Sequence, residues 1–477
     1  MSDNVEGRWA EIFGPRYLPA TIILCLGVAL FAFNAFLSST ALPSAVNELQ
    51  GIELISWATT LYLVFAIVGG AGAVIVKERL GSRWALLSMA LVFLAGSLIA
   101  AAAADMPQVL VGRAVQGLGE GVVAALCFAL IPELYPNRLV PKVFGMQAVI
   151  WAIAGFGGPA GAGALTEFVS WRATFLVNVP LVLMFCLMVM RVVPPGRSGE
   201  VRAGFPGVRL TAIGGGILMI AVASILPFVP AVGLTAAAAL VLVWAIRRDR
   251  KSVAPLTPTG AFWSDTALGP GFWVVLLMPI AGAVTAVYLV MLLQQLWGYG
   301  PTLAGAVGAI MAIGWSCASV TVANVRKRST RKVLIRTGPV LLAVGLFGVL
   351  MGLQMHLPPL LMIAQALIGM GFGISNGYTM LALIEASSAE DRDRTSALIP
   401  TTQSAGNAIG AAIAGLAANA AGYAVATTEP EVLAAILPLF ATGIAIAMLA
   451  GIAAFAMVNR MPSTRTAGAD EPLPSPH

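Results

Sequence analysis

Between two long apolar runs the chain reads Lys77-Glu78-Arg79-Leu80-Gly81-Ser82-Arg83-Trp84. A similar basic stretch, Arg326-Lys327-Arg328-Ser329-Thr330-Arg331-Lys332, separates two later apolar runs. Of the 27 Lys and Arg residues, all but Arg113 and Arg172 lie in or beside alternate gaps between such runs. Basic loops stay on the cytoplasmic side of a membrane, so this alternation predicts a polytopic helical membrane protein with both termini cytoplasmic.

The composition agrees with this class. The chain is 59% hydrophobic and only 10% charged, whereas soluble domains are about 25% charged. The basic residues form short loop clusters rather than one broad face, so we expect no nucleic-acid partner. The four cysteines lie inside apolar runs without metal-like spacing. We therefore expect no disulfide, no metal site and no cofactor.

A membrane-spanning helix needs roughly 20 apolar residues. The sequence predicts fourteen such spans, at 19–43, 54–76, 84–104, 107–133, 141–166, 172–193, 208–228, 231–247, 270–293, 301–323, 333–354, 358–385, 395–422 and 431–459. The span at 231–247 is the shortest and is rich in alanine. If it formed a re-entrant hairpin with 208–228, the flanking loops would keep their orientation, so topology alone does not decide between the two arrangements.

The two quoted basic stretches superpose, with Lys77 on Arg326 and Arg83 on Lys332. This similarity indicates an internal repeat of two six-helix halves, although any two basic loops resemble each other to some degree. The predicted organisation is a cytoplasmic tail at 1–18, a first half at 19–193, a linker with two extra helices at 194–269, a second half at 270–459 and a disordered cytoplasmic tail at 460–477.

Three further motifs lie in the first half: Arg113-Ala-Val-Gln116-Gly117-Leu-Gly119, then Gly145 with Gly158-Pro159 and Gly163, then Trp171-Arg172 through Asn178-Val-Pro180. With them the chain resembles the major facilitator superfamily, specifically its fourteen-helix drug:proton antiporter branch, over nearly its whole length. The resemblance implies an all-α major facilitator fold with two inserted helices.

Two motifs depart from the family pattern. Glu78 stands where the loop motif normally carries Asp. Counting back from Ala41-Leu42-Pro43 places Asn34 and Ser39 where the family normally has an Asp and an Asn. The first span therefore lacks the intramembrane acid on which cation antiport often depends.

Arg113, Gln116 and Glu120 share one face of the fourth span. Arg113 and Glu120 are roughly 10 Å apart along the helix axis, so we expect Gln116 or water to bridge them. Burial disfavours a charged carboxylate, which makes Glu120 a candidate proton carrier. The alternatives are that Arg113 is a structural tie between helices, and that Glu120 is a neutral acid without a transport role.

Other polar and aromatic residues at membrane depth are candidates for the substrate pathway. They are Asn34, Ser38, Trp151, Tyr288, Gln365, Asn376, Gln403 and Asn407. The resemblance implies that spans 19–43, 107–133, 270–293 and 358–385 line a central cavity. It also implies conformational roles for Glu78, Arg79, Gly81, Arg83, Gly145, Gly158, Pro159 and Gly163, with plain close helix packing as the alternative for the glycines.

Enzyme classes are disfavoured, because the only histidines are His356 and His477 and no phosphate-binding Walker sequence is present. A channel would need a ring of like polar residues, which the sequence lacks. We therefore expect a monomeric secondary transporter of the inner membrane that moves a small organic solute by alternating access. The family favours proton-coupled export of amphipathic, drug-like compounds; uptake of an aromatic vitamin such as riboflavin is the alternative.

Overall fold

The computed structural model describes residues 9–136, 139–193, 207–250, 257–263, 265–322, 325, 327–388 and 391–461. Residues 1–8 of the first predicted tail and 462–477 of the second lie outside this part, as do Arg138, Arg326 and residues 194–206 of the linker. The described residues form helices and no strand. The helices are α1 (Trp9–Ile12), α2 (Leu18–Glu48), η1 (Ile52–Leu54), α3 (Ile55–Ala101), α4 (Met106–Leu134), α5 (Val140–Phe168), α6 (Trp171–Leu176), α7 (Asn178–Val192), α8 (Gly207–Ala223), α9 (Phe228–Arg250), α10 (Leu268–Trp297), α11 (Pro301–Val322), α12 (Arg328–Gln354), α13 (Pro358–Ala386), α14 (Arg392–Ala420), η2 (Tyr423–Val425) and α15 (Glu429–Arg460).

Each of the fourteen predicted spans is helical over most of its length, with 172–193 divided between α6 and α7. Twelve described segments are long and apolar enough to cross a membrane. The remaining two are α8, which has 17 residues, and α14, whose polar run from Thr401 to Ser404 lowers its hydropathy. Fourteen crossings therefore remain a prediction. The prediction that 231–247 is the shortest span is wrong, because α9 contains a 21-residue apolar segment and α8 is the shorter helix.

The first quoted basic stretch, Lys77 to Trp84, contains a sharp break between two helical segments, which forms a corner. α3 carries two predicted spans, and its helical geometry breaks at Gly81, whose φ is 75° and ψ is 158°. A residue with a Cβ rarely adopts this backbone conformation, which explains why glycine stands there. Beside the corner, Arg83 Nε donates to the carbonyl of Val193 at 2.6 Å and so fastens it to the end of α7.

The glycines of the Arg113 motif let α4 lie directly against both limbs of α3. A Cβ on Gly117 would lie 2.1 Å from the carbonyl oxygen of Tyr62, and one on Gly119 would lie 2.4 Å from the backbone nitrogen of Phe93. Neither position has room for a larger side chain. This close contact holds α4, and therefore its polar face, in a fixed register on α3.

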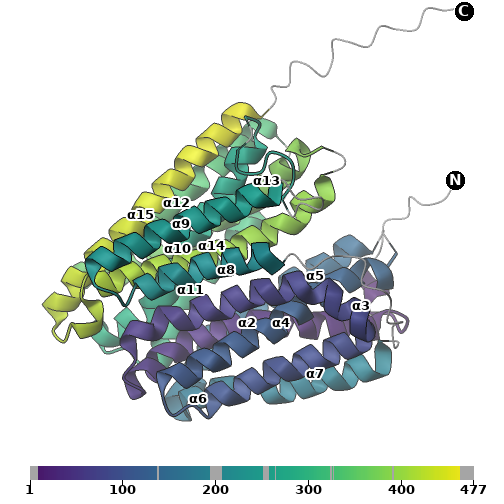
Figure 1. The fold of residues 1–477 in the computed structure, drawn as a ribbon, viewed down its shortest axis with the longest axis horizontal. Coiled ribbons are helices and arrows are strands. Elements are labelled where there is room, and N and C mark those ends of the chain that lie inside the picture. Colours follow the sequence, from purple (N-terminus) through teal and green to yellow (C-terminus); the bar gives the residue numbers. More distant parts are fainter. Residues whose placement is uncertain are drawn as a thin grey trace, which may run out of the picture.

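Two groups of helices are visible, α2–α7 and α10–α15, and they diverge toward one end (Figure 1). One apolar core is built only from residues between Ile12 and Val193. The larger core belongs mainly to α10–α15 but also includes residues of α2, α3, α4 and α6 such as Val46, Ile55 and Trp171. These residues lie at the end of the helix bundle where α2 ends and α3 begins, which we call the opposite end. We call the other end of the bundle, where α2 begins and α15 ends, the terminal end. The two groups are therefore packed together at the opposite end.

α8 and α9 pack against each other, and α8 also lies against α3 of the first group and α14 of the second. Its Ile217 forms a small apolar cluster with Val64 of α3 and Ala408 of α14. Just after α8, Ser224 accepts a hydrogen bond from Trp57 Nε1 at 3.3 Å. The inserted pair thus contacts both groups of helices rather than standing apart from them.

Candidate functional site

A buried polar chain links α2 and α4 at membrane depth. Asn34 Nδ2 donates to Glu120 Oε2 at 2.9 Å, and Ser38 Oγ donates to Asn34 Oδ1 at 3.5 Å. Arg113 Nη1 in turn donates to Ser38 Oγ at 3.0 Å. All four side chains are at most 3% exposed. Two residues of α2 therefore connect the carboxyl and the guanidinium that α4 presents one and a half to two turns apart.

Of the two expected bridges, through Gln116 or through water, the one through Gln116 is wrong. Gln116 Oε1 does accept from Arg113 Nη1 at 2.8 Å, but its Nε2 donates away from Glu120, to Ser97 Oγ on α3 at 2.8 Å. The spacing of residues on one helix face predicts contacts along that helix only, whereas the bridging side chains come from the facing helix α2. Gln116 instead ties the guanidinium to the second limb of α3.

Arg113 is fully enclosed by partners. Its Nε donates to the carbonyl of Ala58 at 3.3 Å, and its Cζ lies 4.0 Å from the centre of the Tyr62 ring. A guanidinium over an aromatic face is stabilised more strongly when both are desolvated. Tyr62 comes from α3. The sequence indicates it only as an aromatic residue that could stack a planar substrate, and helical spacing alone could not predict its contact with Arg113.

One oxygen of Glu120 remains available. Oε1 is buried and accepts no well-aligned hydrogen bond, and the buried Tyr62 hydroxyl, which also lacks one, lies close enough to be its donor. An unsatisfied buried carboxyl oxygen costs free energy, which protonation reduces because the neutral acid is less strongly penalised by low dielectric. The site thus offers a place for a proton beside a fixed positive charge.

The other predicted cavity residues are not part of the polar hydrogen-bonded chain between α2 and α4. Trp151 on α5 is 37% exposed and lies edge-to-face with Phe31 at 5.4 Å and with Phe36 at 6.4 Å. Asn376 Oδ1 accepts from Gln403 Nε2 at 2.9 Å, which joins α13 to α14. The remaining three are Tyr288 and Gln365, both buried, and the exposed Asn407.

Tyr288 and Gln365 each have a buried oxygen without a hydrogen-bond partner, and so does Gln147 on α5, which has neither amide atom paired. Polar groups at membrane depth are costly unless something binds them, so these three side chains of α5, α10 and α13 are candidates to hydrogen-bond a ligand.

The Trp171-Arg172 motif closes the opposite end of the first group. Trp171 Nε1 and Arg172 Nη1 donate to the two oxygens of Glu48, at 2.7 and 2.6 Å, and Arg172 Nη2 donates to the carbonyl of Ala103 at 3.0 Å. The hydrogen bond from Arg172, followed by that from Trp171, lowers the pKa of the Glu48 carboxyl. Glu48 was not predicted, because its partners follow it by more than 120 residues.

Of the residues with expected conformational roles, Glu78 has a buried Oε2 without a partner, Arg79 is exposed and Gly145 lies within α5. The others form contacts. A Cβ on Gly158 would lie 2.8 Å from Phe36 Cβ on α2, and the Pro159 carbonyl lies 2.7 Å from the Cβ position of Gly305 on α11.

α5 and α11 meet most closely near the opposite end. A Cβ on Gly163 would lie 2.4 Å from Thr302 Cα, and Glu167 Oε2 accepts from the Thr302 backbone nitrogen at 3.1 Å. Between α14 and η1, Asn419 Nδ2 donates to the carbonyl of Glu53 at 3.0 Å. These contacts join the two groups of helices at that end, and any state open there must break them.

We expect Gly163→Val to shift the protein toward a state open at the opposite end, because the side chain cannot fit against Thr302. Gly161→Val is the matched control, since nothing lies within 4 Å of a Cβ at Gly161. Distances between spin labels on α5 and α11 should lengthen in Gly163→Val alone. Equal distance distributions in the two variants would show that this contact does not limit opening.

Comparison with known proteins decides the family. The model of the Major Facilitator Superfamily matches residues 24–411. This chain belongs to that superfamily of membrane transporters. A Mycobacterium tuberculosis protein named as a probable multidrug-efflux transporter is 31% identical over 430 residues, covering 87% of this chain and 90% of its own. A multidrug transporter protein of Bacillus subtilis is 26% identical over 420 residues, covering 84% and 75%.

Solved structures agree on the fold of this superfamily member. A peptide transporter bound to alafosfalin matches with a TM-score of 0.67 at 13% identity, covering 93% of this chain and 96% of its own. A D-xylose–proton symporter matches with a TM-score of 0.61 at 16% identity, covering 94% and 97%. The chain is therefore a multi-pass transporter with the major facilitator fold, and its substrate and coupling must be argued from its own residues.

Proposed function

We propose that this transporter exports amphipathic organic compounds in exchange for protons, across a bacterial-type inner membrane. The observation that carries the proposal is Glu120, an acid that is 1% exposed, with one oxygen bound to Asn34 and the other unpaired. The names of the two multidrug-related relatives support a drug-like substrate class.

Coupling follows from the charge of the polar chain. With Glu120 ionised, its negative charge balances Arg113. With Glu120 protonated, the chain carries a net positive charge. Because electrostatic interactions are strong in a low-dielectric interior, a cationic or electron-poor substrate is favoured by the first state and repelled by the second. Proton and substrate would then compete for the same region, which is the requirement for antiport.

An aromatic surface supports the substrate class. Trp151, Phe31 and Phe36 form an edge-to-face cluster on α2 and α5, and its Trp151 ring remains partly exposed. Such rings bind planar apolar groups and also attract organic cations. The cluster shares α2 with Asn34 and Ser38, so we propose that the apolar part of a substrate binds to these rings while its polar part approaches Glu120.

We further propose that the terminal end faces the cytoplasm, as the alternation of basic loops predicts. Cysteines introduced singly at Gln50 and Gln295 in a Cys-free background should react with an impermeant thiol reagent added outside intact cells. A cysteine at Ser329 should react only after the cells are opened. Outside labelling at position 329 would reverse the orientation and with it the direction of every step above.

Overproduction should raise resistance to lipophilic dyes and drugs, and a protonophore that collapses the proton gradient should abolish this protection. Dye efflux from preloaded cells is the measurement, with cells carrying the empty vector as the control. Unchanged efflux over a broad panel, together with growth of a vitamin auxotroph at a low external vitamin concentration, would favour uptake of an aromatic nutrient instead.

A further inference from the structure

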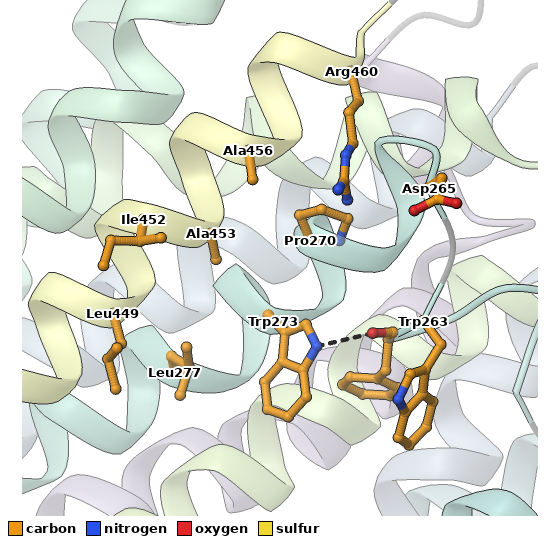
Figure 2. A pocket seen from close by; sticks show the side chains of 11 residues that line it. Trp263, Asp265, Pro270, Trp273, Leu277, Leu449, Ile452, Ala453, Ala456 and Arg460 are labelled. Carbon is orange, nitrogen blue, oxygen red and sulfur yellow. Dashed lines mark hydrogen bonds between the residues drawn. The ribbon is translucent and has the colours of Figure 1, made fainter.

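We propose that the groove between α10, α15 and residues 257–263 and 265–267 binds one zwitterionic phospholipid, with a phosphate ester and a primary ammonium in its headgroup. The groove has a volume of about 490 Å³. Figure 2 shows Arg460 and Asp265 at one end of it, Trp263 and Trp273 beside them, and Leu449 and Leu277 toward the other end. It is separate from the polar chain around Glu120, and the proposal does not depend on the transport function.

The length of the groove matches one leaflet. Its α15 wall extends from Leu449 to Arg460, which is 11 residues or roughly 16 Å at 1.5 Å per residue. The hydrocarbon core of a bilayer is about 30 Å thick, so half of it is about 15 Å. Arg460 is the last residue of α15 and lies at the terminal end. A lipid with its headgroup at Arg460 would therefore place its acyl chains against Leu449 and Ile452.

The charges at the headgroup end are complementary to a zwitterion. Arg460 presents a guanidinium, which suits the planar pairs of phosphate oxygens. Asp265, across the groove, presents an exposed carboxylate, which suits a primary ammonium. Trp263 and Trp273 are 41% and 37% exposed, as expected of indole rings at a membrane interface. An anionic lipid without an amine would meet the Asp265 carboxylate without compensation.

The wall formed by 257–263 is held in place by hydrogen bonds. Trp273 Nε1 donates to the carbonyl of Phe262 at 2.9 Å (Figure 2), and the Phe262 ring packs against Phe272 and Trp273 with centroids 5.5 Å apart. Phe262 adopts φ 66°, a left-handed conformation that is uncommon for an aromatic residue and that persists only where contacts enforce it.

Two buried carboxyls fasten the same wall from behind. Asp249 Oδ2 accepts from both the backbone nitrogen and the hydroxyl of Thr257, at 2.8 and 2.7 Å. Asp391 Oδ2 accepts from the Thr259 backbone nitrogen at 2.9 Å. Asp249 also pairs with Arg209. The groove is therefore preformed, so a lipid would bind without first ordering the segment.

The test uses the full chain purified in mild detergent, with phosphatidylethanolamine, phosphatidylglycerol or soluble phosphoethanolamine added. Native mass spectrometry should show one retained phosphatidylethanolamine, and Arg460→Gln should lower its occupancy about fivefold, as expected for one arginine–headgroup contact. Arg191→Gln is the control, because Arg191 is exposed in the last turn of α7 and lies outside the groove. Asp265→Asn should remove the preference for phosphatidylethanolamine over phosphatidylglycerol.

Equal retention of the two lipids by the unmodified protein would overturn the proposal, and so would equal occupancy in Arg460→Gln and Arg191→Gln. Thermal stabilisation by phosphoethanolamine alone would show a headgroup-anion site rather than a lipid groove, which also contradicts it. If Arg460→Gln does not purify, the comparison of lipids on the unmodified protein still decides the matter.

Discussion

Glu120→Gln should still bind substrate but should lose transport against a gradient, by about tenfold or more if this acid carries the proton. Glutamine keeps the shape of the side chain, and its carbonyl oxygen can still accept the hydrogen bond from Asn34 Nδ2. It cannot gain or lose a proton. Substrate exchange without a proton gradient should therefore persist, and the measurement is the ratio of gradient-driven transport to exchange in proteoliposomes.

The geometry also predicts the effect of restoring the acid that the family usually carries in its first helix. Asn34 Nδ2 lies 2.9 Å from Glu120 Oε2, so Asn34→Asp would place two carboxyls side by side. One of the two must then stay protonated at neutral pH. We expect the double variant Asn34→Asp/Glu120→Gln to regain part of the coupled transport. Full transport by Glu120→Gln, with unchanged pH dependence, would remove Glu120 from the mechanism.

Arg113→Gln should be the most destabilising single change in the polar chain, at about 3–5 kcal/mol, because it leaves a buried carboxylate without its compensating cation. Arg113 is 2% exposed and donates to Ala58, Ser38 and Gln116. The measurement is the thermal unfolding midpoint in detergent at alkaline pH, where the acid is ionised.

The double variant Arg113→Gln/Glu120→Gln provides the decisive comparison. With both charges removed, much of the lost stability should return, with a coupling energy of about 1–3 kcal/mol between the two positions. Strictly additive losses would mean that Arg113 stabilises the protein through its hydrogen bonds alone. Arg191→Gln, on the exposed end of α7, should leave the midpoint unchanged.

Much of the fold is predictable because apolar length and basic loops act locally. Gly81 breaks α3 where the basic stretch predicted a loop, and the Arg113 motif lies on a helix packed closely against α3. The predicted lengths of α8 and α9 were in the wrong order. The length of the uninterrupted apolar run predicts a membrane-spanning helix better than the alanine content does. α14 shows the converse. It is helical throughout, but its polar residues lower its hydropathy, so that it is not a clear membrane-spanning segment.

The residues of the candidate site were predictable from the sequence, but the hydrogen bonds that connect them were not. Asn34, Ser38, Arg113, Gln116 and Glu120 were all selected from the sequence as costly polar groups in apolar helices. Their connection through α2, and the contribution of Tyr62, depend on how α2 and α3 pack around α4, which no single-helix periodicity contains. Glu48 was missed for the same reason, because only the folded chain brings it to Trp171 and Arg172.

Under the proposed function, substrate and proton move in opposite directions through a protein whose titrating group is Glu120. Proteoliposomes enriched in inside-out transporters and loaded with a pH-sensitive dye test it directly. Adding a lipophilic cation outside should make the lumen more alkaline, because protons leave as substrate enters, and Glu120→Gln should show no such change. Substrate entry without any proton movement in the unmodified protein, or the same alkalinisation in Glu120→Gln, would contradict the account.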